Sequence, residues 1–386
     1  MRDGLDTVFP AAALLVARHG RVVFDRPYGF LDPETRQRPA RSDSLFDLAS
    51  VAKLFTATAF MTLVEAGRVG LDTPVGDVLL EFKGVRPIGP TEDPLTKVPV
   101  PADPTYAGQE VDTRQVTFWH LLTHTSGLAA WRSLYRENGE AGDAVPMPHD
   151  VPAEKRARRV AAIHGLYGFA YPPGQHMVYS DLGLILLGEA VARLTGTLLE
   201  ACVQQRVLEP LGLTHTTYNP LACGVPAERI VPTDFCAWRQ RRCIGEVHDE
   251  NAASLGGVAG HAGLFGTAWE VAVLGQTFLN GGSYGNARIL SPDTVTEMTR
   301  VHVDFEDNPR GLGWLRRSHG WSSSGRWFSP RSYGHTGFTG TSLWIDPDRA
   351  LLVVLLTNRV YYGRDSEGIV DFRPRLHDAV AEALRQ

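Results

Sequence analysis

The sequence predicts an α/β (α+β) fold, in which an antiparallel sheet is flanked by helices and joined to a mainly helical subdomain. Strand patterns gather near both ends of the 386-residue chain, and helical patterns fill its middle. Because a sheet buries its apolar face against helices, we expect both ends to share one sheet. The chain is expected to be one unit, residues 1–386, with a sheet subdomain over about 1–48 and 257–386 and a helical subdomain over about 49–256.

The strands are predicted from short apolar runs bounded by turn residues. Residues 11–27 form a predicted hairpin around the turn His19-Gly20. Near the C-terminus, further strands are predicted over 312–316, 342–345 and 351–357.

Helices are predicted where apolar residues recur at helical spacing. The first runs from Val51 to Val64, and Gly67 behind it is typical of a left-handed C-terminal cap. The later helices are predicted over 116–123, 153–164, 181–194 ending at Gly196, a following stretch to about 208, then 267–279, 292–300 and about 375–384. Residues 84–112, which contain six prolines, and residues 219–256 are expected to be irregular.

Composition excludes several classes of function. The net charge of −5 argues against a nucleic-acid-binding surface. Apolar runs stay well short of the length that a membrane-spanning helix needs, and the N-terminus lacks the pattern of a signal peptide. The chain as given is therefore expected in the cytoplasm, or in the periplasm or outside the cell if its natural start lies upstream. The four cysteines match no zinc spacing and are expected to be free thiols.

One lysine stands out. Only four of the 38 basic residues are lysines, and Lys53 lies inside the apolar helix, where the sequence would be expected to avoid charge. An amine, unlike a guanidinium, can lose its proton, and burial is expected to lower the pKa of Lys53 towards neutrality. Ser50 precedes it by three residues, so both side chains share one helix face, as a nucleophile and its base would. The alternative is a capping serine and a lysine that reaches out to solvent.

Two further segments carry chemistry-bearing side chains. Tyr179-Ser-Asp181 lies just before a predicted helix, where the phenol is either functional or a half-buried structural group. His335-Thr-Gly337 leads into a predicted strand, and its glycine would let a substrate lie close to the backbone. His261, near His248 and Asp249, is a pocket candidate, although a hydrogen-bonded core role is an equal alternative.

Taken in order, these segments resemble the serine hydrolases of the penicillin-binding protein and class C β-lactamase type. That family carries Ser-x-x-Lys, Tyr-x-Asn and then Lys-Thr-Gly or His-Thr-Gly. The resemblance runs from about residue 10 to the C-terminus and includes the flanking segments Leu45–Ser50, Leu121–Leu128, Pro173–Asp181 and Gly257–Phe265. It implies a β-lactamase/transpeptidase-like fold and a reaction without a metal or an organic cofactor.

The resemblance also implies a role for each matching residue. Ser50 would attack a carbonyl and form an acyl-enzyme, while Lys53 and Tyr179 share the proton as general base and acid. Backbone N–H groups of Ser50 and Phe338 would hold the oxyanion. The remaining predicted substrate contacts are Asp181, His335, Thr336 and Gly337, with Arg359 as a candidate carboxylate clamp.

Two departures from the family pattern bear on the substrate. Asp181 replaces the usual asparagine and could hold Lys53 charged, and His335 replaces the lysine of β-lactamases. We therefore expect a serine hydrolase that acts on an ester or on a D-amino-acid-type peptide of cell-wall origin, with weak β-lactamase activity. The alternatives are a β-lactamase, a D-alanyl-D-alanine carboxypeptidase, and a non-catalytic sensor of penicillins or peptidoglycan fragments. The expected partner is a small molecule or a peptidoglycan fragment, and the oligomeric state is left open.

Overall fold

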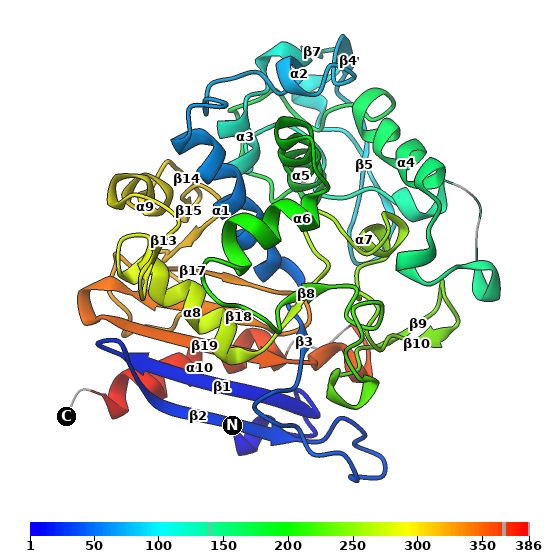
Figure 1. Ribbon diagram of the computed structural model, residues 1–386. Coiled ribbons are helices and arrows are strands. Elements are labelled where there is room, and N and C mark those ends of the chain that lie inside the picture. The colour runs from blue at the N-terminus through cyan, green and yellow to red at the C-terminus, as the bar shows by residue number, and fades with distance from the viewer. Residues whose placement is uncertain (138, 140, 365–367, 385–386) are drawn as a thin grey trace.

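An antiparallel sheet of eight strands spans the molecule (Figure 1). The computed structural model describes residues 1–137, 139, 141–364 and 368–384. The strand order is β14-β15-β16-β17-β18-β19-β1-β2, and every neighbouring pair is antiparallel. The strands are β1 (Ala11–Arg18), β2 (Arg21–Gly29), β14 (Val303–Phe305), β15 (Asn308–Arg310), β16 (Leu315–Arg316), β17 (Tyr333–Thr336), β18 (Ser342–Asp346) and β19 (Leu351–Thr357). Leu14 of β1 lies opposite Leu355 of β19, so the prediction that both chain ends share one sheet is confirmed.

The two central strands are apolar without alternation because both faces of the sheet are covered. β19 is buried along its whole length, and β1 is buried except at Arg18. On one face, Leu15 and Leu356 belong to the main core together with helix α8 (Ala268–Leu279). On the other face, Leu14 and Leu355 pack with helix α10 (Gly368–Ala383). A sheet covered on both sides needs continuous apolar strands rather than alternating ones.

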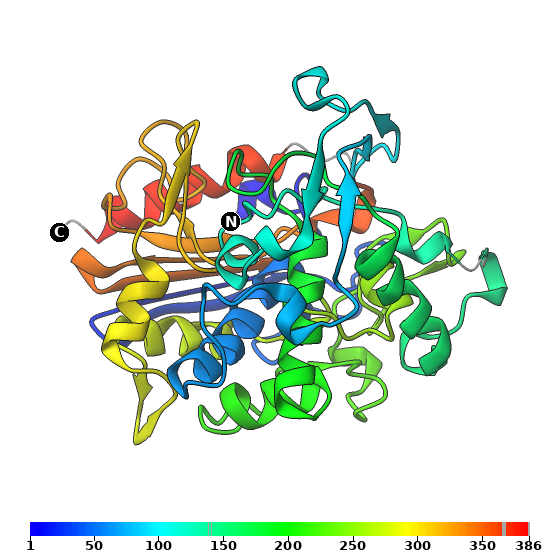
Figure 2. The same cartoon turned by 90° about the horizontal axis from the view of Figure 1, so that it is seen from above.

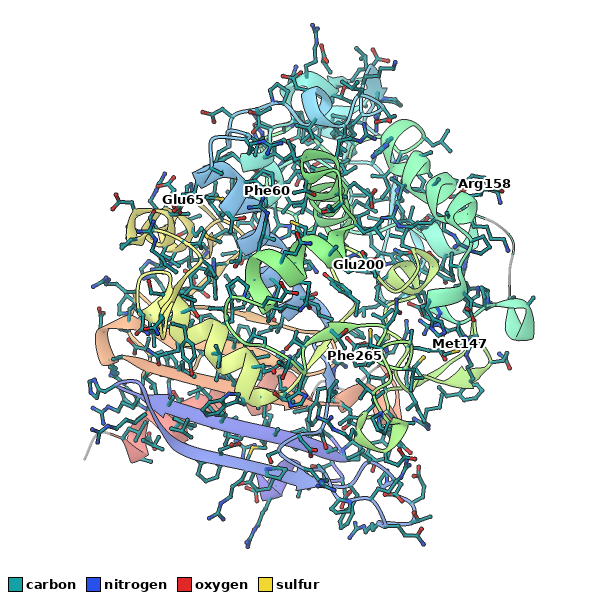
Figure 3. All side chains as sticks on the ribbon, in the orientation of Figure 1. Phe60, Glu65, Met147, Arg158, Glu200 and Phe265 are labelled. Atoms are coloured by element: carbon teal, nitrogen blue, oxygen red, sulfur yellow. The ribbon has the colours of Figure 1, made fainter. Side chains whose placement is uncertain are left out.

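The helical region is built around two buried helices. Helix α1 (Ala52–Glu65) is buried on nearly all sides and packs against α5 (Asp181–Thr195), as the view from above shows (Figure 2). Side chains fill the space between α1 and the short strand that contains Phe265. Phe60 of α1 and Phe265, both labelled in Figure 3, are almost fully buried. The other helices are α2 (Val75–Val78), α3 (Phe118–Leu122), α4 (Ala153–Gly165), α6 (Leu199–Val203), α7 (Glu250–Ser254) and α9 (Pro292–Thr299).

Short strands complete the architecture. β3 (Phe46–Asp47), β11 (Leu264–Gly266) and β8 (Thr217–Tyr218) form a small sheet just before the start of α1. The remaining pairs are β4 (Val85–Pro87) with β7 (Glu110–Asp112), β5 (Thr91–Glu92) with β6 (Pro99–Val100), β9 (Phe235–Cys236) with β10 (Arg241–Arg242), and β12 (Ser283–Tyr284) with β13 (Ala287–Arg288).

Most predicted elements are confirmed, including the hairpin, α1, α4, α5, α8 and α9. Gly67 and Gly196 both adopt the left-handed conformation expected behind a helix. The segment 84–112 holds only the short strands β4 to β7 and no long regular element, as predicted. Three predictions are wrong. Helix α7 lies in a segment expected to be irregular. Residues 312–314 are not strand, because Gly313 turns at φ +75° and lies against Ala57. Helix α10 starts at Gly368 and continues through Pro374, since Ile369 and Phe372 pack under the sheet.

Within the described ranges, no single helix is both long and apolar enough to cross a membrane. One bent pair, α5 followed by residues Leu199–Leu208 at an angle of 77°, passes the same criteria on length and composition.

Candidate active site

Ser50 lies at the entrance to α1, in a single 3-10 turn (Ala49–Val51) that continues into the helix. The residue before it, Ala49, has φ +47°, an uncommon conformation for a residue with a side chain. Asp47 stabilises this turn by accepting a hydrogen bond from the N–H of Ala49 at 2.8 Å. Strained backbone of this kind is often found at functional sites, where the surrounding structure must hold it in place.

Lys53 uses all three of its donor positions. Its side chain is 1% exposed, and Nζ donates to Ser50 Oγ at 2.8 Å and to the main-chain oxygen of His261 at 3.0 Å. The third neighbour is Asp181 Oδ1, at 2.8 Å in an ion pair. The structure therefore brings Ser50 and Lys53 together, with Asp181 beside them.

The sequence-based expectation for the pKa of Lys53 is wrong in sign. Burial is the largest single effect and lowers this pKa, but the charge of Asp181, the charge of Tyr179 and hydrogen bonding to both together raise it by more, so the pKa lies above its ordinary value of 10.5. Lys53 is therefore an ammonium ion in the resting site. The reason lies in the departure from the family pattern, because an asparagine would bring no negative charge to this position.

Tyr179 also lies beside Lys53. Lysine Nζ is 4.8 Å from the centre of the phenol ring, and the rings of His124 and His335 flank the phenol at 4.5 and 5.9 Å. Among the described residues, the hydroxyl of Tyr179 has no hydrogen-bond partner although it is buried. Burial raises the pKa of Tyr179 and outweighs the opposite effect of Lys53, so the group is a neutral phenol.

His335 and Thr336 end β17, Gly337 follows directly, and the segment lies beside the entrance to α1. A Cβ atom on Gly337 would come within 2.7 Å of the main-chain oxygen of Leu48, so only glycine allows this approach. Nδ1 of His335 is 2.8 Å from the Thr336 carbonyl and thus carries the proton, and burial holds the pKa of His335 at about 3. In the described part of the chain, the N–H of Phe338 donates to no backbone carbonyl.

Ser50, Tyr179 and Phe338 border two cavities of about 350 Å³ each. We call the first the aspartate pocket; its walls include Trp131, Asp181, Asp249, Glu250 and His261. We call the second the arginine pocket; its walls include His335, Thr336, Gly337, Arg310, Arg359 and Arg373. The nucleophile candidate thus stands between two pockets of different chemistry.

Among the described residues, the arginine pocket is lined by cationic side chains and by no acidic one. Arg310 is 8% exposed, and among the described residues its guanidinium has neither an ion pair nor a hydrogen bond; it lies 5.7 Å from the ring centre of Tyr179. Arg373 donates to the carbonyls of Gly337 and Thr341 at 2.7 and 3.0 Å. Burial lowers the pKa of Arg310 to about 10 and that of Arg373 to about 9, so both remain charged at neutral pH.

Arg310 and Arg373 were not identified from the sequence. They come from β15 and α10, and only the folded chain shows that they line one pocket, in which the described part of the chain places no acidic side chain. Arg359, the clamp candidate, lines the same pocket, and its Nε donates to the carbonyl of Phe338 at 2.6 Å. It therefore supports the segment that carries the predicted oxyanion donor.

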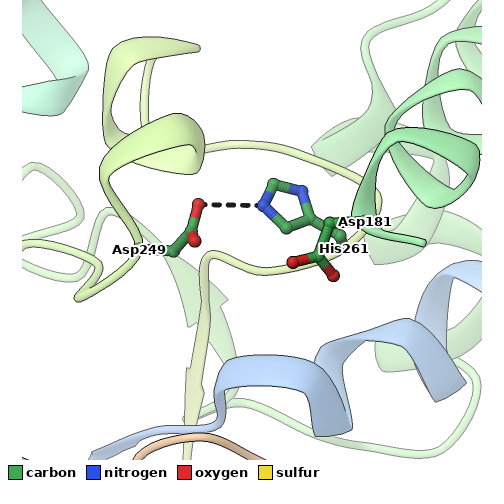
Figure 4. Close-up of side chains that lie close together, drawn as sticks. All are labelled: Asp181, Asp249 and His261. Atoms are coloured by element: carbon green, nitrogen blue, oxygen red, sulfur yellow. Dashed lines mark hydrogen bonds and ion pairs between the residues drawn. The ribbon is translucent and has the colours of Figure 1, made fainter. Parts of the chain in front are cut away.

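His261 lines the aspartate pocket, as predicted for a pocket candidate, and pairs with Asp249 (Figure 4). Its Nε2 lies 2.9 Å from Asp249 Oδ1, and the ligand atoms of Asp181, Asp249 and His261 all lie within 4.8 Å of one another. Such a group could hold a divalent cation in principle. Here, however, the ammonium of Lys53 already contacts Asp181, so a metal ion would have to compete with a fixed positive charge.

Comparison with known proteins gives the same family as the motifs. The family model described as Beta-lactamase matches residues 1–372. The chain belongs to this family. Two curated relatives carry the name "Putative D-alanyl-D-alanine carboxypeptidase": one from Escherichia coli (strain K12), 30% identical over 384 residues that cover 92% of this chain and 80% of the relative, and one from Salmonella agona (strain SL483), 31% identical with coverages of 93% and 81%.

Solved structures of the beta-lactamase family share the fold. A penicillin-binding protein homologue from Caulobacter crescentus superposes with a TM-score of 0.70 at 21% identity, covering 99% of this chain and 95% of that one. EstCE1, described as a hydrolase with promiscuous acyltransferase activity, gives a TM-score of 0.68 at 23% identity, with coverages of 97% and 96%. Together with the relatives, family membership identifies this chain as a serine hydrolase with a β-lactamase/transpeptidase-like fold.

Proposed function

We propose that this chain is a carboxypeptidase that removes the last residue from a D-alanyl-D-alanine-type peptide of cell-wall origin, through an acyl-enzyme on Ser50. The observation that carries the proposal is the charge of Arg310, which has no ionic partner among the described residues and lies beside Ser50 and Tyr179. A buried cation without a partner is costly, and a substrate carboxylate would satisfy it. The names of the curated relatives support the D-alanyl-D-alanine substrate class.

Arg310 and Arg373 resolve the difficulty raised by His335. That histidine is neutral and cannot replace the family's lysine as a cation. In our proposal the two arginines supply the missing positive charge from neighbouring elements, and the terminal carboxylate of the substrate lies in the arginine pocket. The acyl part of the substrate then extends into the aspartate pocket on the other side of Ser50.

Acylation begins with proton transfer away from Ser50. Its proton passes to Lys53 Nζ while Lys53 passes one of its own protons to Asp181 Oδ1, across contacts of 2.8 Å each. Ser50 Oγ bonds to the carbonyl carbon, and the N–H groups of Ser50 and Phe338 hold the oxyanion. When the C–N bond breaks, the phenol of Tyr179 gives its proton to the leaving amine and regains one from Lys53. Lys53 then recovers its proton from Asp181.

Deacylation reverses these roles with water in place of the amine. Water gives a proton to the oxygen of Tyr179 while Tyr179 passes its own proton to Lys53 and Lys53 passes one to Asp181. The water oxygen bonds to the acyl carbon, the bond to Ser50 Oγ breaks, and Ser50 Oγ takes a proton from Lys53, which recovers one from Asp181. The released amino acid must first vacate the arginine pocket to admit the water. A β-lactam keeps its leaving amine tethered to the acyl group, so we expect its deacylation to be slow and nitrocefin turnover to be weak.

The decisive experiment compares a peptide ending in D-alanyl-D-alanine with the same peptide ending in an amide. We expect wild-type kcat/KM to be much higher for the free carboxylate. Arg310→Gln should lower kcat/KM for that substrate by about 10- to 100-fold, as for a lost charge-assisted contact, and should leave the amide peptide little changed. Ser50→Ala should remove both activities, and Arg331→Gln, at an exposed arginine paired with Asp348, is the matched control.

Two outcomes would redirect the assignment. Equal rates on the carboxylate and the amide would remove the basis of the proposal. A second candidate, a sensor that is acylated but barely turns over, is favoured by the ammonium state of Lys53, because the hydrolytic water then has no neutral amine beside it to accept its proton directly. Intact-mass measurement after penicillin treatment separates the two, since a lasting adduct together with no peptide hydrolysis indicates the sensor.

A further inference from the structure

A third and larger cavity, of about 1150 Å³, opens beside the aspartate pocket. Leu95, Lys97, Glu250 and Arg364 line both cavities, so the two spaces are continuous along one wall. The catalytic steps proposed above use no residue of this larger cavity.

Aromatic side chains dominate its rim. Phe235 on β9 and Tyr362 are each 55% exposed, which is a large exposure for aromatic rings. Trp238, in the turn between β9 and β10, and Tyr135 contribute further rings, 4.8 Å apart between centres. We call this cavity, defined by Phe235, Trp238, Tyr135 and Tyr362, the aromatic groove.

Charged groups of both signs line the aromatic groove, and they contact one another or an aromatic ring. Lys97 lies 3.4 Å from the centre of the Trp131 ring, and Arg136 lies 5.3 Å from the centre of the Tyr135 ring. Arg364 is paired with both Asp234 and Glu250, at 3.0 and 2.5 Å. The hydroxyl of Tyr361 donates to Glu34 at 2.8 Å, and Arg242 lies 3.8 Å from the centre of the Tyr361 ring. The arginine pocket, in contrast, has no acidic side chain among the described residues. Because charges of both signs are mixed along its wall, the aromatic groove is suited to a ligand that has apolar faces and many hydroxyl or amide groups.

A saccharide has this combination, because the C–H face of a sugar ring packs on an aromatic ring while its hydroxyls bond to fixed polar groups. We propose that the aromatic groove binds a saccharide unit carried on the acyl side of the peptide substrate. This inference rests on the proposed function for its direction: with the terminal carboxylate in the arginine pocket, the acyl part leads through the aspartate pocket to the groove. The preferred substrate would then be a glycopeptide rather than a free peptide.

The test compares two substrates with one stem peptide ending in D-alanyl-D-alanine, either free or carrying a disaccharide of N-acetylhexosamines at its N-terminal end. We expect kcat/KM to be about tenfold higher for the glycopeptide, the size of effect that one stacked aromatic contact produces. Phe235→Ala and Tyr362→Ala should each reduce this ratio several-fold. Trp269→Ala, at a half-exposed tryptophan on α8 outside the groove, should keep the wild-type ratio.

A ratio near one in the wild type, or losses that are equal for both substrates in the two variants, would overturn the saccharide site. If neither substrate is hydrolysed, the proposed function fails. A direct binding measurement then tests separately whether the aromatic groove binds a saccharide. For that purpose the free disaccharide is titrated into Ser50→Ala protein and followed by saturation-transfer NMR. Contact signals that disappear in the Phe235→Ala double variant support the site, and their absence from the start rejects it.

Discussion

One side-chain oxygen sets the charge state of the whole site. Asp181 Oδ1 lies 2.8 Å from Lys53 Nζ and keeps that group an ammonium ion despite its burial. Because Tyr179 is also held protonated, the resting site must lose a proton, or move one internally, before Ser50 can attack. Such closely coupled groups titrate as a unit, so the pH dependence of the rate reports on all three.

Asp181→Asn is therefore expected to shift the pH profile of kcat/KM to lower pH. In the native protein the carboxylate raises the pKa of Lys53, so activity grows as pH rises; without that charge, burial lowers the same pKa and the rising limb moves towards acid. The measurement is kcat/KM against pH on a D-alanyl-D-alanine peptide. Glu189→Gln, on the same helix but paired with Arg156, is the control. An unmoved limb would mean that Asp181 does not set the charge of Lys53.

At the residue scale, the sequence predicted which site residues lie together better than it predicted their pKa values. Ser50, Lys53 and Tyr179 were expected together and lie together, because the spacing of Ser50 and Lys53 fixes their common helix face. The pKa of Lys53 was predicted with the wrong sign, since the effect of Asp181 depends on where its side chain points. Arg310 was missed because its importance is the lack of a partner, which no local pattern reveals.

At the scale of elements, close contact between α5 and the segment that precedes His261 positions two parts of the site. A Cβ atom on Gly188 of α5 would lie 2.9 Å from both Cα and N of Gly260. This contact keeps Asp181, at the start of α5, and the carbonyl of His261 on either side of Lys53. Only glycine at positions 188 and 260 allows the backbone of α5 to contact the segment before His261.

Gly188→Ala is expected to destabilise the protein although alanine usually favours a helix. The helical gain is about 1 kcal/mol, whereas forcing a methyl group against backbone costs about 1–3 kcal/mol. Gly183→Ala in the same helix is the matched control, since its nearest neighbour would be 3.6 Å away, and it should be neutral or stabilising. Urea denaturation of both variants measures the difference. Equal stability of the two would show that the close approach is absent.

Elements with strong periodicity were predicted, and elements that depend on their neighbours were not. β17 contains Gly334 and is followed directly by Gly337, two glycines that weaken any strand pattern, and it forms because β16 and β18 pair with it on both sides. Helix α10 was predicted to begin after Pro374, yet burial of Ile369 and Phe372 under the sheet extends it towards the N-terminus. Tertiary packing overrides local propensity in both cases.

At the scale of the whole molecule, covering both faces of the sheet buries titratable groups far from solvent. Three histidines illustrate this: His335 on β17, His377 on α10, and His124 beside Tyr179. Burial holds the pKa of His335 at about 3 and that of His377 at about 4, and it holds the pKa of His124 well below 6.5. The folded protein therefore keeps all three neutral in conditions under which the unfolded chain would protonate them.

Stability is consequently expected to fall as pH falls through the window between about 6.5, the histidine pKa of the unfolded chain, and about 4. Below about pH 6.5 these histidines bind protons in the unfolded state but not in the folded state. The free energy of unfolding therefore falls by up to about 1.4 kcal/mol per pH unit for each histidine. The carboxylates whose pKa is lowered by folding, such as Asp234, act in the same direction but mainly at lower pH, because their unfolded value is 3.8.

His377→Gln tests this account because it removes one group that takes up a proton on unfolding. In the wild type, Nδ1 of His377 lies 2.8 Å from the carbonyl of Arg373, and the glutamine side chain can still donate to that carbonyl. The free energy of unfolding, measured in urea at several pH values across the window, should depend on pH less steeply by about one proton. His19→Gln, at the exposed turn of the first hairpin, should leave the slope close to that of the wild type. An unchanged slope in His377→Gln would mean that His377 is protonated in the folded state as readily as in the unfolded chain.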